Sequence, residues 1–155
     1  MSLARSRMYR SAGATAILSL AAISNAQLAS PASDRRPLVT IKEVMELTIA
    51  PATNGLWAVP ERPTDEEWAA LEQASITLLV AADFIARGGA GAHDEEWARN
   101  PAWAAFNRAL VDAGLDALKA VRARDLAALT AAGDVLYPPC EGCHLQFNPG
   151  VVGEK

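Results

Sequence analysis

Both cysteines of this 155-residue chain and one of its two histidines lie together in the run CEGCH, at residues 140–144. Cys140 and Cys143 are three residues apart, so on a helix their thiols project to the same side, one turn apart. Such thiols can ligate a metal, pair as a disulfide or bond covalently to a prosthetic group. His144 follows directly, and only 11 residues follow it. We therefore expect the chemistry of this chain near its C-terminal end.

The spacing Cys-x-x-Cys-His is the attachment signature of c-type haem. In that linkage the two thiols add across the two vinyl groups of the macrocycle, which lie on neighbouring pyrroles. The adjacent histidine is then held beneath the iron. We expect one covalently attached haem c, with thioethers to Cys140 and Cys143 and with His144 as the proximal iron ligand.

Three other uses of the motif compete with this interpretation. A structural zinc site needs four ligands, and His93 is the only Cys or His outside the motif. A thioredoxin-like redox pair requires a βαβ context, which this chain lacks. A disulfide is possible outside the cytosol but does not explain His144.

The first 26 residues have the features of a cleavable secretory signal peptide. A short basic region with Arg5, Arg7 and Arg10 precedes the apolar run AGATAILSLAAIS and a small-residue site ending at Ala26. The apolar run is shorter than the roughly 20 residues of a membrane span. An amphipathic N-terminal helix of the folded domain is the alternative. We expect export to the periplasm, cleavage near Ala26 and no membrane span in the mature chain.

Without residues 1–26 the chain is acidic, because this segment carries three arginines and no acidic residue. The net charge falls from −4 to −7. An acidic surface disfavours nucleic acid and anionic membranes as partners. It is compatible with docking to a basic patch on a redox partner protein, which the sequence does not identify.

The remainder of the chain is predicted to be helical, since alanine is abundant and apolar residues recur every three or four positions. Thr40 with Glu43, and Thr64 with Glu67, form the capping-box pattern that begins a helix. We expect Pro51 to kink or split the first helix. The second helix should stop at a surface loop, GGAGAHDEE, whose acidic run at 94–96 we interpret as a solvated helix start.

Two more helices are expected in the second half of the chain. Asn100 is the expected N-cap of the third helix, with Pro101 at its first position, and the fourth helix is expected to start at Asp125. The fourth helix is expected to end before Pro138 and Pro139. Four amphipathic segments with short connections predict an all-α fold, an antiparallel four-helix bundle with haem near the C-terminal end of the last helix. The expected organisation is a signal peptide (1–26), a linker (27–39), a four-helix-bundle cytochrome domain (40–148) and a tail (149–155).

With its haem motif near the end of the last predicted helix, the chain resembles the cytochrome c-prime family over roughly residues 38–148. The runs IKEVMELTIAPATNGLW, PTDEEWAAL and YPPCEGCHLQFNPGV support this resemblance. The resemblance implies a distal residue on the first helix, and the matching position is Met45. In some relatives this methionine ligates iron, and in others the distal residue only covers the face. The family often has a basic residue four or five positions after the haem histidine, whereas here Asn148 and Pro149 occupy those positions.

Met45 is the only methionine in residues 27–155 and lies on the predicted inward stripe. We expect it to be the distal iron ligand; ordinary core packing is the alternative. His93 is expected to be a solvated loop residue rather than a ligand. Of the four tryptophans, Trp57 or Trp68 is expected near the haem, although core packing accounts for all of them equally well.

The leading functional hypothesis is a periplasmic monohaem c-type cytochrome that transfers single electrons and is not an enzyme. One alternative is a five-coordinate haem protein that binds NO or CO. Another is a haem-free helical module that uses its CxxC as a disulfide or metal clip. The family resemblance also makes a homodimer possible.

Overall fold

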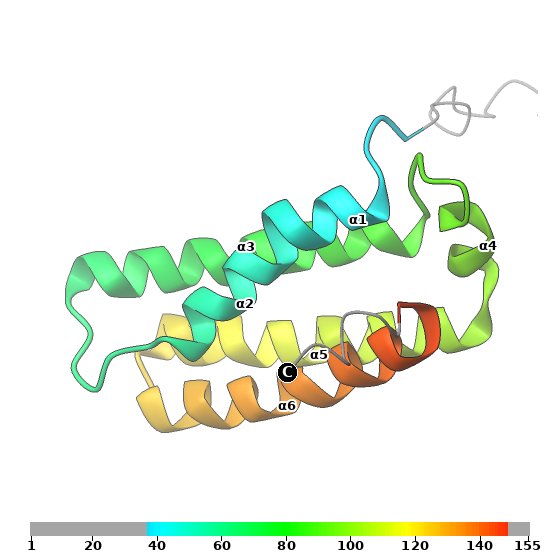
Figure 1. Cartoon of the computed structure of the whole chain (residues 1–155). Coiled ribbons are helices and arrows are strands. Elements are labelled where there is room, and N and C mark those ends of the chain that lie inside the picture. The colour runs from blue at the N-terminus through cyan, green and yellow to red at the C-terminus, as the bar shows by residue number, and fades with distance from the viewer. Residues whose placement is uncertain (1–36, 149–155) are drawn as a thin grey trace, which may run out of the picture. The chain divides into compact units, whose positions relative to one another are not determined.

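The computed structural model describes residues 37–148, and all secondary structure in this part of the chain is helical. The expected all-α class is therefore confirmed for these residues. The predicted signal peptide (1–26), most of the predicted linker (27–39) and the predicted tail (149–155) lie outside the described residues, which Figure 1 draws in colour.

Residues 37–148 form a segmented first helix, three long helices and one short helix. The first segment comprises α1 (Ile41–Val44), the π-helix η3 (Met45–Ile49) and α2 (Ala50–Trp57). The long helices are α3 (Asp65–Ala86), α5 (Pro101–Ala123) and α6 (Leu126–Phe147). The short helix α4 (Asp94–Arg99) lies between α3 and α5 (Figure 1).

All four predicted helix starts are confirmed, because each depends on residues close together in sequence. The side chains of Thr40 and Thr64 accept the backbone N–H three residues on, and the glutamates there accept in return. Asn100 accepts the N–H of Ala102 at 2.9 Å. The side chain of Asp125 caps α6 in the same way. Capping groups of this kind are each worth about 1 kcal/mol.

The predicted disturbance at Pro51 takes the form of a π-turn in the residues immediately before it. The N–H of Ala50 bonds to the carbonyl of Met45, five residues back, where an α-helix would use the residue four back. Pro51 has no N–H, and its ring cannot pack against the Leu47 carbonyl of a regular α-helix. The wider turn lets the helix continue through the proline to Trp57.

Helix α5 packs against both α3 and α6 and runs opposite to each of them. Trp103, near the start of α5, donates its indole N–H to the carbonyl of Ile85 near the end of α3, at 3.0 Å. About three turns further along α5, Gly114 lies against Leu78 and Leu79, nearer the middle of α3. The core consists of apolar residues from all of these helices, and its most completely buried large side chains are Leu56, Leu78, Leu129 and Leu136.

The end of the first segment is fixed to α6 by a tryptophan. Trp57 donates its indole N–H to the carbonyl of Gly133 at 2.9 Å. A Cβ on Gly133 would lie 3.2 Å from Trp57 Cδ1, so the absence of a side chain there allows the ring to approach. Helix α2 therefore packs on both α6 and α3.

The predicted end of the last helix before Pro138 is wrong, because α6 continues through both prolines to Phe147. The prolines remove two helical N–H groups, which leaves the carbonyls of Asp134 and Val135 without their usual partners. Both of these residues are exposed, so water can solvate the free carbonyls. Pro139 itself is buried and continues the apolar stripe of the helix.

Helix α3 is long and apolar enough to cross a membrane by length and composition. A core helix satisfies the same criteria, and a single such helix is weak evidence for a span. Here the residues of α3 that face α2 and α5 are buried, among them Trp68, Leu71 and Leu78.

Candidate functional site

A single large cavity brings the predicted site residues together. Its volume is about 710 Å³, within the usual range of roughly 300–1,000 Å³ for ligand and cofactor sites. Its walls come mainly from the first helical segment, the start of α5 and the end of α6. The predicted site residues Met45, Cys140, Cys143 and His144 all line it.

The motif occupies the last part of α6, where the helix continues beyond the prolines. Cys143 is buried, Cys140 and His144 are half-buried, and both cysteines are free thiols. Burial raises the pKa of the Cys140 thiol. Burial, together with the neighbouring Cys140, raises the pKa of Cys143 to about 11. Both thiols are therefore protonated at neutral pH in the folded chain.

The glycine inside the motif allows α5 to approach it. A Cβ on Gly142 would lie only 2.6 Å from Cε1 of Phe106, whereas carbon atoms in contact are normally about 3.5–4.0 Å apart. Phe106 also lines the cavity. The residue between Cys140 and Gly142 is Glu141, which accepts a hydrogen bond from the hydroxyl of Tyr137 at 3.1 Å.

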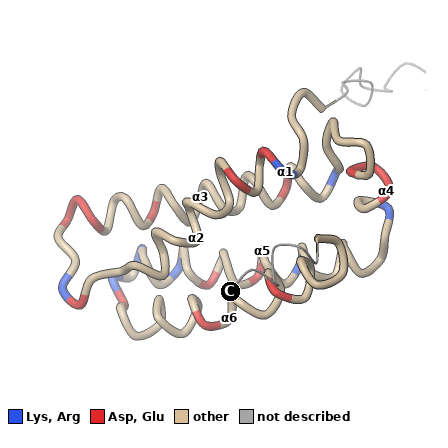
Figure 2. The backbone as a smooth tube through the Cα atoms, in the orientation of Figure 1, with Lys and Arg blue, Asp and Glu red and all other residues tan. Residues whose placement is uncertain are grey.

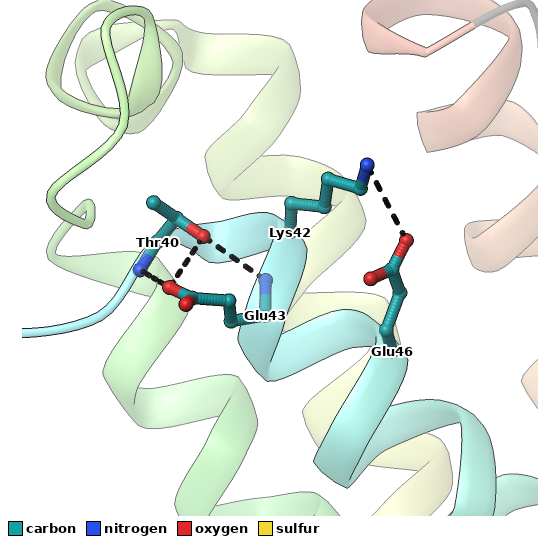
Figure 3. Close-up of polar contacts among 4 residues, drawn as sticks. All are labelled: Thr40, Lys42, Glu43 and Glu46. Carbon is teal, nitrogen blue, oxygen red and sulfur yellow. Dashed lines mark hydrogen bonds and ion pairs between the residues drawn. The ribbon is translucent and has the colours of Figure 1, made fainter.

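Met45 approaches the cavity from the first helical segment. It is half-buried, packs against the core and is the first residue of the π-helix. Figure 3 shows the polar contacts at the start of this segment: the capping box of Thr40 and Glu43, and the ion pair of Lys42 with Glu46 at 3.7 Å. Lys42 and Glu46 both line the cavity and are solvent-exposed, so they form part of its polar rim.

Aromatic rings form one end of the cavity. Trp97 stacks on Trp103 with ring centroids 5.8 Å apart, and Phe147 meets Trp103 edge-on at 5.2 Å. All three rings line the cavity, as does Trp57. Trp68 is buried in the core and is not among the lining residues. Of the two tryptophans expected near the haem, Trp57 therefore lines the cavity and Trp68 does not, whereas Trp97 and Trp103 line it without having been singled out.

One polar atom in the cavity wall has no partner. The side-chain oxygen Oδ1 of Asn107 is buried and accepts no hydrogen bond within residues 37–148. A buried amide oxygen without a partner costs about 1–3 kcal/mol, so it is normally satisfied by a ligand or by an ordered water. Asn107 follows Phe106 on the cavity side of α5. Asn107 was not among the residues predicted to face inward. Its spacing, four residues after Trp103 and three before Leu110, was the available signal.

The acidic run at 94–96 is only partly solvated. Asp94 is 4% exposed, which contradicts the expectation of a solvated side chain. Its carboxylate accepts backbone N–H groups from the loop and from α1, so burial is compensated. His93 lies on the surface as predicted, with Nδ1 3.6 Å from a carboxylate oxygen of Glu96. It is not among the residues that line the cavity.

A zinc site receives no support from this geometry. Among residues 37–148, no three His, Cys, Asp or Glu side chains converge as metal ligands. His93, the fourth ligand that zinc would require, lies away from the cavity. The motif therefore provides two thiols and one imidazole directed at a large apolar space.

The donor set and the volume of the cavity fit a covalently bound haem. Two thiols one helical turn apart can form two thioethers, and His144 and Met45 supply a nitrogen and a sulfur, which are both ligands of haem iron. The aromatic and aliphatic walls suit a flat apolar macrocycle, and Lys42 is the one cationic side chain among the lining residues that could pair with its carboxylates. Asn107 offers one buried hydrogen-bonding group in a mainly apolar lining.

No protein-family model matches this chain, and no curated protein matches it either. The resemblance to the cytochrome c-prime family therefore depends on the motif and the helix order alone.

Proposed function

We propose that this chain is a monohaem c-type cytochrome that carries single electrons, built on the antiparallel four-helix bundle of cytochrome c-prime-like proteins. The observation that supports it best is that Met45 and the Cys140–His144 motif, about a hundred residues apart in sequence, line one cavity. On this proposal the cytochrome is exported to the periplasm.

In this proposal each of the four predicted site residues has a defined role. Cys140 and Cys143 would tether the haem, His144 on α6 would bind the iron, and Met45 on the first helical segment would be the second iron ligand. Haem iron supplies the one-electron chemistry when it is bound. The apolar walls exclude water, and His/Met ligation raises the reduction potential relative to two histidines. On this proposal the chain is an electron carrier rather than an enzyme.

The acidic surface supports docking to a basic redox partner. Acidic side chains outnumber basic ones on the described helices, including the starts of α3 and α4 (Figure 2). Because such docking depends on charge, the rate of electron exchange with a basic partner should fall as salt is added.

The first test is an optical spectrum, oxidised and then reduced, of protein expressed with the haem-attachment machinery. A low-spin spectrum with a sulfur-to-iron charge-transfer band supports the proposal. Met45→Leu, which keeps an apolar side chain and removes the only sulfur outside the motif in residues 27–155, should abolish that band. A colourless protein with the mass of the bare chain would refute the proposal and leave the haem-free module.

A five-coordinate gas-binding protein is the second candidate, and the packing of Met45 favours it. Met45 packs on the buried core, which is also the role of a distal residue that covers iron without binding it. This candidate predicts a high-spin spectrum that changes at once when carbon monoxide is added to the reduced protein. It also predicts that Met45→Leu leaves the spin state unchanged.

A further inference from the structure

Helix α4 begins with a buried carboxylate that reaches across to the first helical segment. Oδ2 of Asp94 accepts the backbone N–H of Ile41, the first residue of α1, at 2.8 Å. The same oxygen accepts the N–H of Gly91 at 2.8 Å. Nearby, the N–H of Ala90 donates to the carbonyl of Val39 at 2.9 Å. The loop before α4 is thus fastened to the start of the segment that carries Met45.

Two glycines allow the carboxylate to sit this close. A Cβ on Gly89 would overlap Oδ2 of Asp94 and lie 2.7 Å from the backbone nitrogen of Ile41. A Cβ on Gly91 would lie 2.6 Å from Oδ1 of Asp94. Since carbon and oxygen atoms in contact need more than 3 Å, neither glycine can be replaced without displacing the carboxylate or α1.

The other side of α4 contacts the end of α6. Trp97, one turn after Asp94, packs on Phe147 with ring centroids 6.1 Å apart. Phe147 lies three residues after His144 on the same helix. Trp97 also stacks on Trp103, which is buried and hydrogen-bonded to the carbonyl of Ile85 in α3. Trp97 therefore contacts both α5 and α6.

We propose that α4 acts as a clamp that fixes the spacing between Met45 and His144 across the cavity, with Asp94 as its positioning residue. Asp94 holds the start of the Met45 segment, and Trp97 holds the end of the His144 helix. The clamp keeps Ile41 and Met45 in the cavity wall, where they would cover the distal face of a bound haem. This inference rests on the proposed haem site and adds the residue that controls access to it.

The test is the rate of carbon monoxide binding to the reduced, haem-loaded full chain. Asp94→Asn keeps the shape of the side chain but replaces a charged acceptor with a neutral amide. Release of α1 should raise the association rate about tenfold, because the distal residues no longer cover the iron. Asp83→Asn is the control, since Asp83 is an exposed carboxylate paired with Arg87 at 2.6 Å. Its rate should match that of the wild type.

Gly89→Ala provides a second variant that displaces α1 without changing any charge. It should raise the rate in the same direction as Asp94→Asn. All association rates are measured well below the melting temperature of each variant, where the protein is fully folded. A residue of merely structural importance would lower the melting temperature and leave the association rate unchanged. The rate reports distal covering whether Met45 ligates iron or only shields it.

The outcomes separate the inference from the proposed function. Haem bands with unchanged rates in Asp94→Asn and Gly89→Ala would overturn the clamp and leave the cytochrome proposal intact. An equal rise in Asp83→Asn would also overturn the clamp. Absence of haem bands in the wild-type protein would overturn the cytochrome proposal itself, and the clamp with it.

Discussion

Replacing Gly142 by alanine tests the packing of the motif directly. The new Cβ would lie 2.6 Å from Cε1 of Phe106, so the two helices must separate by about 1 Å to restore a normal contact. Overpacking of this kind costs about 1–3 kcal/mol. The higher helix propensity of alanine returns about 1 kcal/mol. The net loss in the free energy of unfolding is therefore about 0–2 kcal/mol.

Gly55→Ala is the matched control, because it makes the same chemical change where there is room. A Cβ there would meet only the Cβ of Ala74, at an ordinary 3.9 Å. This variant should be stabilised by about 0.5–1 kcal/mol. Subtracting the two changes in the free energy of unfolding cancels the contribution of helix propensity. The difference should be about 1–3 kcal/mol.

The assay is urea unfolding of each purified protein, followed by circular dichroism of the helices. A double-mutant cycle with Phe106→Leu completes it, since a smaller side chain relieves the overlap. Gly142→Ala should cost at least about 0.5 kcal/mol less in that background. Equal stabilisation by Gly142→Ala and Gly55→Ala would refute the packing argument.

Three further perturbations follow from the structure. Trp57→Phe removes the hydrogen bond to the Gly133 carbonyl and should lower the free energy of unfolding by about 0.5–1.5 kcal/mol in urea; an unchanged midpoint would contradict this. Hydrogen bonds from the backbone and side chain of Thr40 lower the pKa of Glu43. The ionised Glu43 therefore stabilises the folded protein fully above the ordinary pKa of a glutamate, about 4.3. This stabilisation is lost as the pH falls through the lowered pKa of the folded state. Glu43→Gln should accordingly show a smaller loss of stability on acid titration than the wild type. In the folded haem-free chain, alkylation of Cys143 should accelerate only as the pH approaches about 11, whereas in urea it should accelerate near pH 8.5; identical profiles would contradict the burial of this thiol.

The parts of the fold that sequence predicts well are those determined by neighbours along the chain. Thr40 and Thr64 begin helices because their partners are three residues away, and the periodic apolar positions identify the buried faces. The continuation of α6 past Pro138 could not be obtained in this way. It depends on exposed carbonyls one turn earlier and on the burial of Pro139 and Cys143, which only the packed structure supplies.

The candidate site shows the same division. The motif and Met45 were identified from sequence, and the structure places all four of these residues at one cavity. Asp94 was misassigned to the solvent, since its partner Ile41 is 53 residues away and no local pattern connects them. Asn107 was not singled out, because an unpaired polar atom can be recognised only when its surroundings are known.

The π-turn at Met45–Ile49 has a consequence for how this segment can change in evolution. The cavity-lining residues Ile41, Met45, Ile49, Thr53 and Trp57 follow one another at intervals of four. A regular α-helix rotates about 40° further at each such interval, so its side chains would leave the cavity within a few steps. A π-turn encloses one residue more than an α-turn and absorbs part of this rotation. The turn is equivalent to a one-residue insertion, and loss of a residue such as the exposed Leu47 would turn Trp57 away from Gly133. Insertions and deletions here are thus more consequential than most substitutions, and related chains that bind the same ligand should keep the length of this segment constant.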